Sequence, residues 1–258
     1  TETKRDANAY LASEPIGRLL LKFSVPCVLS MLVSALYNLW TRSLSGRASV
    51  TSEMRQLMSS IRSPWLLWPW PCWLGMEAQP IKLSLGSGDK ETSHKCIGNG
   101  ILATVIIGLL LTVTGFLFTD QILRLFGVTE ASYPYAREYM EVILLGIPFY
   151  IFASGMNAAI RADGSPAYSM FSTVIGAVLN LILDPVAIFV FHMGVRGAAI
   201  ATVIGQVVSC FVTILYFRKP KSFRFSKASF LPAGRLLGQI GQLGISSFIT
   251  QIAIVIVM

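Results

Sequence analysis

The chain has 258 residues, of which 53% are hydrophobic and 13% charged, with a net charge of +8 and a mean hydropathy of +0.63. A soluble domain carries about 25% charged residues, so this composition argues against a soluble enzyme and against a disordered protein. Long uncharged stretches separate the basic residues, which argues against nucleic-acid binding. The composition indicates an integral helical membrane protein with the lipid bilayer as its main partner.

Apolar segments recur along the chain at about the 20-residue length that crosses a bilayer core. In chain order, we predict spans at 16–39, 97–118, 139–160 (with a kink at Pro148), 167–191 and 195–217. A last apolar segment begins near Leu236 and continues to Met258. Because the chain stops inside this segment, we expect it to be a truncated part of a longer protein.

The charges in the loops predict the orientation of the chain. Basic residues precede the first span, and the longest basic loop follows residue 217; it contains Arg218, Lys219, Lys221, Arg224 and Lys227. By the positive-inside rule, the N-terminus and this loop lie in the cytoplasm. We therefore expect a multi-pass protein of the plasma membrane, the inner membrane of a bacterium. The N-terminus and this loop can lie on the same side only if an even number of spans separates them. The five predicted spans therefore require one more, between residues 39 and 83.

Residues 40–81 do not resemble the rest of the chain, because they contain all five tryptophans and four crowded prolines. Read one base earlier, the codons for Trp40-Thr41 give Asp, and those for Trp68-Pro69 give Ala. The hidden frame reads as an alanine- and leucine-rich membrane helix. We therefore hypothesise two compensating frameshifts, near Asn38-Leu39 and near Ile81-Leu83, whose correction restores the missing span. The alternative is an interfacial loop rich in Trp and Arg.

Asn180 and Asp184 lie four residues apart in the span 167–191, so their side chains share one face of the helix. Pro185 follows directly and loosens the helix, which frees a backbone carbonyl. An acid inside the membrane costs at least about 2.5–3.5 kcal/mol on insertion scales and is functional by default. We expect a site that exchanges Na⁺ or H⁺ against a cationic substrate. The alternative is an aspartate at the outer end of the helix.

Two other polar features accompany this pair. Thr202, on the next span, can add an oxygen to the same cavity, although threonines on membrane helices usually bond their own backbone. Residues 161–166 form a polar turn between spans. We expect Arg161, Gly164 and Pro166 in this turn to form a conformational hinge rather than a binding site.

Together these segments resemble the MATE (multidrug and toxic compound extrusion) family of secondary transporters. The matching segments are 14–20, 23–26, 85–89 with Glu91, 146–149, 160–166, 180–185 and 194–202. Their order and spacing carry the resemblance, which covers the whole chain except residues 40–81.

The resemblance implies an all-α, polytopic membrane fold of twelve helices in two six-helix lobes. By that pattern, residues 1–217 form the N-terminal lobe of about six transmembrane helices. Residues 218–234 are the cytoplasmic loop between the lobes, and residues 235–258 begin the seventh helix. The C-terminal lobe of the same protein is then missing from this chain.

The resemblance also implies an activity. The family consists of antiporters, not enzymes, that export small cationic amphiphilic compounds in exchange for Na⁺ or H⁺ without an organic cofactor. Its cation site corresponds to Asn180, Asp184 and Thr202, with Asn180 and Asp184 as candidate Na⁺ ligands. A first-helix Asp of that site falls in the altered frame, where this chain has Trp40-Thr41. We further expect Pro26 and Pro185 to act as hinge positions in their helices.

Three alternatives remain open. A lipid-linked oligosaccharide flippase of a related fold is expected to line its cavity with more basic residues. A six-helix half-transporter that works as a homodimer needs a chain that ends in a loop. A non-transporting pseudogene product needs nothing further, and for this chain as it stands the sequence favours that last interpretation.

Overall fold

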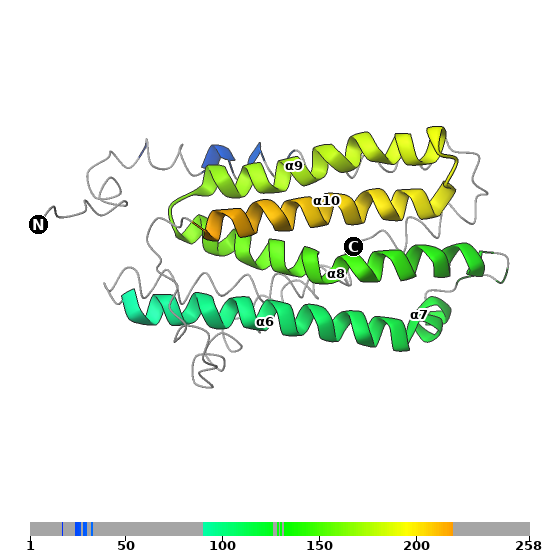
Figure 1. Ribbon diagram of the computed structural model, residues 1–258, viewed down its shortest axis with the longest axis horizontal. Coiled ribbons are helices and arrows are strands. Elements are labelled where there is room, and N and C mark those ends of the chain that lie inside the picture. Colours follow the sequence, from blue (N-terminus) through cyan, green and yellow to red (C-terminus); the bar gives the residue numbers. More distant parts are fainter. Residues whose placement is uncertain are drawn as a thin grey trace, which may run out of the picture.

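The computed structural model describes residues 90–125, 128, 130 and 132–218, and residues 17, 24–26, 28, 29 and 32 nearer the N-terminus. The elements in this part of the chain are α6 (Lys90–Leu117), α7 (Thr119–Leu125), α8 (Tyr133–Ala162), α9 (Pro166–Pro185), the π-helix η2 (Val186–Val190) and α10 (Gly194–Phe217). Every one of these elements is a helix, which confirms the all-α fold class (Figure 1).

Four helices in the described ranges are long and apolar enough to cross a membrane: His94–Leu117, Tyr133–Ala162, Pro166–Val190 and Gly194–Phe217. They match the predicted spans 97–118, 139–160, 167–191 and 195–217 to within three residues at each end, except that the second helix begins at Tyr133, six residues before the predicted start. Within the predicted span 16–39, the described residues are helical. The predictions for residues 40–81, 218–234 and 235–258 concern parts of the chain outside the described residues, apart from Arg218. The chain is a multi-pass membrane protein.

The four long helices lie side by side in the order α6, α8, α10, α9, with α8 and α10 in the middle (Figure 1). Glycines set the closest approach between α9 and α10. A β-carbon at Gly176 would lie 2.9 Å from the carbonyl oxygen of Gly205, and one at Gly205 would lie 2.8 Å from the carbonyl oxygen of Gly176. Small residues allow such backbone contact between membrane helices, where apolar burial gives little drive for association.

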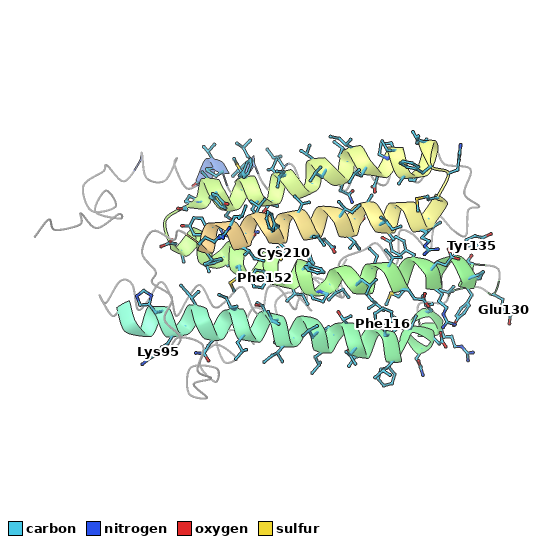
Figure 2. All side chains as sticks on the ribbon, in the orientation of Figure 1. Lys95, Phe116, Glu130, Tyr135, Phe152 and Cys210 are labelled. Carbon is cyan, nitrogen blue, oxygen red and sulfur yellow. The ribbon has the colours of Figure 1, made fainter. Side chains whose placement is uncertain are left out.

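The outer faces of the bundle are apolar, as expected for helices that contact lipid. Leu109, Leu110 and Val113 are exposed on α6, and Phe171 and Ile182 are exposed on α9. Figure 2 shows the charged residues Lys95 and Glu130 at opposite ends of the bundle. The distribution of charge therefore fits a bundle whose long axis crosses the bilayer.

The short helix α7 was not predicted from the sequence. Its Leu123 is buried against Ala136 of α8, and its Asp120 accepts a hydrogen bond of 2.5 Å from the hydroxyl of Tyr133. Arg137 of α8 lies 3.9 Å from Asp120 and 3.0 Å from Glu141. These contacts hold α7 against the first turns of α8. A seven-residue helix gives too short a periodic pattern to be recognised from sequence.

Candidate functional site

The candidate cation site lies on the buried face of α9. Asp184 is 0% exposed and Asn180 is 4% exposed, and one helical turn separates them. The same face carries Ser172 and Gly176 at the same four-residue spacing, so α9 turns one polar stripe towards its neighbours and an apolar surface outward. Asp184 is therefore an acid buried within the bundle, in the last turn of α9.

Thr202 of α10 lies opposite Asn180. The Asn180 amide nitrogen donates a hydrogen bond of 3.0 Å to the Thr202 hydroxyl oxygen, and this hydroxyl donates to the Ala198 carbonyl at 2.9 Å. The single hydroxyl proton of Thr202 is thus directed at its own helix, while its oxygen accepts from Asn180. Because its amide nitrogen points at α10, Asn180 turns its carbonyl oxygen away from Thr202. Thr202 thereby fixes the orientation of Asn180.

Pro185 marks a change in helix type directly after Asp184. α9 ends at Pro185, and the chain continues as the π-helix η2, in which the Phe191 amide donates to the Val186 carbonyl at 3.1 Å. π-Helical turns are rare and concentrate at functional sites. The sequence predicted that Pro185 loosens the helix, and the altered hydrogen-bond pattern is the form that this loosening takes.

The other predicted hinge residues lie at two places. Pro26 is half-buried and helical. Arg161 lies in the last turn of α8, Pro166 begins α9, and Gly164 between them has a φ of +75°, which glycine adopts at no steric cost. The turn at residues 163–165 therefore depends on Gly164, and Arg161 bridges it by donating a hydrogen bond of 3.2 Å to the Ser169 hydroxyl.

Sequence reasoning missed the most buried member of this turn, Asp163. It is 0% exposed, and its carboxylate accepts a hydrogen bond of 2.5 Å from the hydroxyl of Tyr216 near the end of α10. Tyr168 of α9 stacks on Tyr216 at a centroid distance of 4.9 Å and donates to the Val212 carbonyl at 2.9 Å. The turn is thus attached to the end of α10, the helix that leads into the basic loop.

A second polar cluster, also missed, joins three helices in the interior. The hydroxyl of Ser172 on α9 lies 3.3 Å from the Asn157 carbonyl oxygen on α8 and 3.0 Å from the Thr213 hydroxyl on α10. Ser209 of α10 donates to the Ser172 backbone carbonyl at 2.9 Å. The available signal was the four-residue spacing of small and polar residues on both helices: Ser172, Gly176 and Asn180 on α9, and Gly205, Ser209 and Thr213 on α10.

The chemistry available at the site is that of a buried carboxylate beside an amide. In the part of the chain that the structure describes, no three His, Cys, Asp or Glu side chains come together to hold a metal ion. A cation bound here would therefore use the Asp184 carboxylate together with neutral oxygens, such as the Asn180 side-chain carbonyl. Carboxylate and carbonyl oxygens suit hard cations.

Comparison with known proteins shows which families and proteins the chain resembles. Residues 83–186 match the MatE family model. The chain is similar to the multidrug export protein MepA of Staphylococcus haemolyticus, at 26% identity over 93% of this chain and 54% of the relative. It is also similar to MepA of Staphylococcus aureus strain MRSA252, at 27% identity over 94% of this chain and 54% of the relative. The chain therefore spans about half the length of these curated relatives.

Solved structures show the same fold. A crystal structure of MATE in its straight conformation superposes with a TM-score of 0.83 at 26% identity, over 92% of this chain and 54% of that one. An outward-facing multidrug resistance MATE family transporter of the MOP superfamily superposes with a TM-score of 0.88 at 24% identity, over 99% of this chain and 57% of that one. The family model, the relatives and the fold all point to the MATE family, which this chain resembles in sequence and in fold.

Proposed function

We propose that the chain supplies the cation-binding half of a secondary antiporter that exports small cationic amphiphilic compounds in exchange for Na⁺ or H⁺. The observation that supports this most directly is Asp184, fully buried one turn from Asn180 on the inward face of a helix long and apolar enough to cross a membrane. An ionisable residue inside a membrane bundle marks an ion or substrate pathway by default. The relatives named multidrug export proteins add independent support.

The mechanism follows from the cost of burying charge. A cation bound beside an ionised Asp184 in this buried position stabilises its charge. Na⁺ or H⁺ binding therefore favours the arrangement of the bundle in which the site is closed around Asp184. Loss of that cation, or its replacement by the cationic substrate, favours another arrangement. Coupling requires only that the two states differ in cation affinity.

Export further requires a second half that faces this one across a cavity. Transporters of this kind move one repeat against another around a site near the middle of the bilayer. We propose that the length by which the relatives exceed this chain provides that half. We also propose a plasma-membrane location with a cytoplasmic N-terminus, supported by the basic residues after α10.

The test is binding of a cationic amphiphile to the purified chain in nanodiscs, with tetraphenylphosphonium as the probe. We expect the chain to bind the probe and to release it when Na⁺ or H⁺ is raised. Asp184→Asn should abolish this competition, whereas Glu138→Gln, at an exposed carboxylate on α8, should leave it intact. Failure of the wild-type chain to bind the probe would overturn the proposal.

Export itself is tested separately, by ethidium accumulation in bacteria that lack their own efflux pumps. If the chain acts only together with a second half, cells that express it alone should accumulate ethidium as fast as control cells. Slower accumulation that depends on Asp184 would instead show that this chain exports by itself, as a half-transporter does.

A further inference from the structure

The middle of α8 contains a proline whose missing hydrogen bond is supplied by another helix. Pro148 lies near the centre of the 30-residue helix α8, which bends near its middle in Figure 1. Proline has no backbone N–H, so the carbonyl four residues earlier, that of Leu144, loses its partner within the helix. The hydroxyl of Thr112 on α6 lies 3.1 Å from this Leu144 carbonyl oxygen and donates to it.

The surroundings of Pro148 are built for this contact. A β-carbon at Gly108 would lie 2.9 Å from the Pro148 α-carbon, so only glycine lets α6 approach the proline so closely. One turn further along α6 from Thr112, a β-carbon at Gly115 would lie 2.2 Å from Leu144 Cδ2. Leu144 itself is buried in a cluster with Ile147 and Ile151. These contacts hold the α6 backbone where the Thr112 hydroxyl reaches the Leu144 carbonyl, which has no N–H partner within its own helix.

Thr112 has a second acceptor for the same proton. Its hydroxyl also lies 2.9 Å from the Gly108 carbonyl of its own helix. A threonine hydroxyl has one proton, so it donates fully to only one of the two carbonyls at a time. When the proton is directed at the Leu144 carbonyl, a hydrogen bond joins the Pro148 turn of α8 to α6. When it is directed at Gly108, the turn is released.

On the side of this turn that faces α10, the described residues provide no hydrogen bond comparable to that of Thr112. Gly146, two residues before Pro148, faces Gln206 of α10, whose side-chain oxygen would lie 2.2 Å from a β-carbon at Gly146. This Gln206 oxygen is buried and, within the described ranges, has no hydrogen-bond partner. Buried acceptors are nearly always paired, so an oxygen without a partner among the described residues calls for an ordered water or another conformation of the Gln206 side chain.

We propose that Thr112 is a positioning residue for α8: its hydroxyl replaces the hydrogen bond that Pro148 removes, and its alternation between two carbonyls makes the Pro148 turn a reversible hinge. The hinge lies between α6 and α10, so its bending moves the two halves of α8 relative to the helix that carries Thr202. This inference concerns the conformation of the helix and holds whether or not the chain binds a coupling cation.

Hydrogen exchange of the backbone amides at residues 149–152, measured by mass spectrometry on the full chain in nanodiscs, tests the proposal. Thr112→Val keeps the shape of the side chain and removes the donor, and we expect these amides to exchange roughly fivefold faster. Thr112→Ser keeps the hydroxyl and should behave like the wild type. Thr114→Val is the matched control, because among the described residues the Thr114 hydroxyl donates to the Leu110 and Leu111 carbonyls of its own helix and not to another helix.

A double-mutant cycle separates the proposed role from a general loss of packing. Pro148→Ala restores an N–H that can reach the Leu144 carbonyl, so Thr112→Val should have no effect on exchange in that background. Equal acceleration by Thr112→Val with and without Pro148→Ala would overturn the proposal. So would unchanged exchange in Thr112→Val alone. If Thr112→Val does not fold, Thr112→Ser and Thr112→Ala provide the same comparison. The serine variant should exchange at the wild-type rate, and the alanine variant should exchange faster.

Discussion

Gly176 of α9 and Gly205 of α10 each lie against the carbonyl oxygen of the other, and this contact divides the polar residues between the two helices into two groups. On one side are Asn180, Asp184 and Thr202; on the other are Ser172, Ser209 and Thr213. Backbone contact at the glycines leaves no room for a side chain between the groups. The candidate cation site is therefore closed along this seam towards the end of the bundle that holds Asp163.

Alanine at either glycine is expected to destabilise the chain. A β-carbon at Gly176 or Gly205 would meet a backbone oxygen below 3.0 Å, and a backbone cannot move aside as a flexible side chain can. We expect Gly176→Ala and Gly205→Ala each to lower the free energy of unfolding by about 1–3 kcal/mol. Thermal unfolding in detergent measures this change.

Gly17 provides the matched control for this experiment. It is helical and exposed, and a β-carbon there would meet nothing within 4 Å. Gly17→Ala should be neutral or slightly stabilising, since alanine favours the helix by roughly 1 kcal/mol over glycine. Equal unfolding temperatures for Gly176→Ala, Gly205→Ala and the wild type would show that α9 and α10 do not touch in this way.

Removing the hydroxyl of Tyr216 is expected to loosen the turn between α8 and α9. Tyr216→Phe deletes the 2.5 Å hydrogen bond to the fully buried Asp163, and a bond to a carboxylate contributes about 1.5–3 kcal/mol. Tyr135→Phe, at a residue that is 47% exposed, should change stability by less than about 0.5 kcal/mol. Similar unfolding temperatures for the two variants would contradict the assigned role of the Tyr216–Asp163 pair.

Substitutions at Thr202 test whether this residue orients the Asn180 side chain. If Thr202 orients the Asn180 amide, Thr202→Val should weaken the cation-dependent change in probe binding several-fold, and Thr202→Ser should restore it, because serine keeps the hydroxyl at the same place. Probe binding at a series of Na⁺ and H⁺ concentrations gives the affinity. An unaltered affinity in Thr202→Val would mean that Asn180 does not need this partner.

The nature of residues 40–81 is decided by the gene. We expect resequencing to show one shifted base near the codons for residues 38–39 and a compensating one near those for residues 81–83. The corrected frame would then place Asp where this chain has Trp40-Thr41. A clean reading of the present frame in a working exporter gene would contradict the frameshift hypothesis.

The long apolar segments made most of the described fold predictable from sequence. Apart from the start of α8, the four described spans begin and end within three residues of the predicted ones, because bilayer thickness fixes the length of an apolar helix. The candidate site was reached in the same way, since an acid and an amide four residues apart must share a helical face. Pro185 was recognised as a disturbance, but the π-helical form of that disturbance was not.

What the sequence did not reveal depends on contacts between helices. Thr112 and Leu144 are 32 residues apart, and no local pattern pairs a hydroxyl with a carbonyl on another helix. Asp163 lies in the predicted polar turn at residues 161–166, and the local sequence gives no sign that its side chain is buried. Asp163 is buried because the last turn of α10 places Tyr216 against it, and this contact between distant segments cannot be read from the local sequence.

The central claim is that Asp184 binds the coupling cation, and the thermal unfolding midpoint of the purified chain tests it most directly. Midpoints are compared in NaCl and in choline chloride and at two pH values, for the wild type, Asp184→Asn and Glu138→Gln. A ligand at 100 times its dissociation constant stabilises the folded state by about 2.7 kcal/mol. We predict stabilisation by Na⁺ or by H⁺ in the wild type and in Glu138→Gln, and its loss in Asp184→Asn. The same response in Asp184→Asn as in the wild type, or no response in the wild type, would contradict the account.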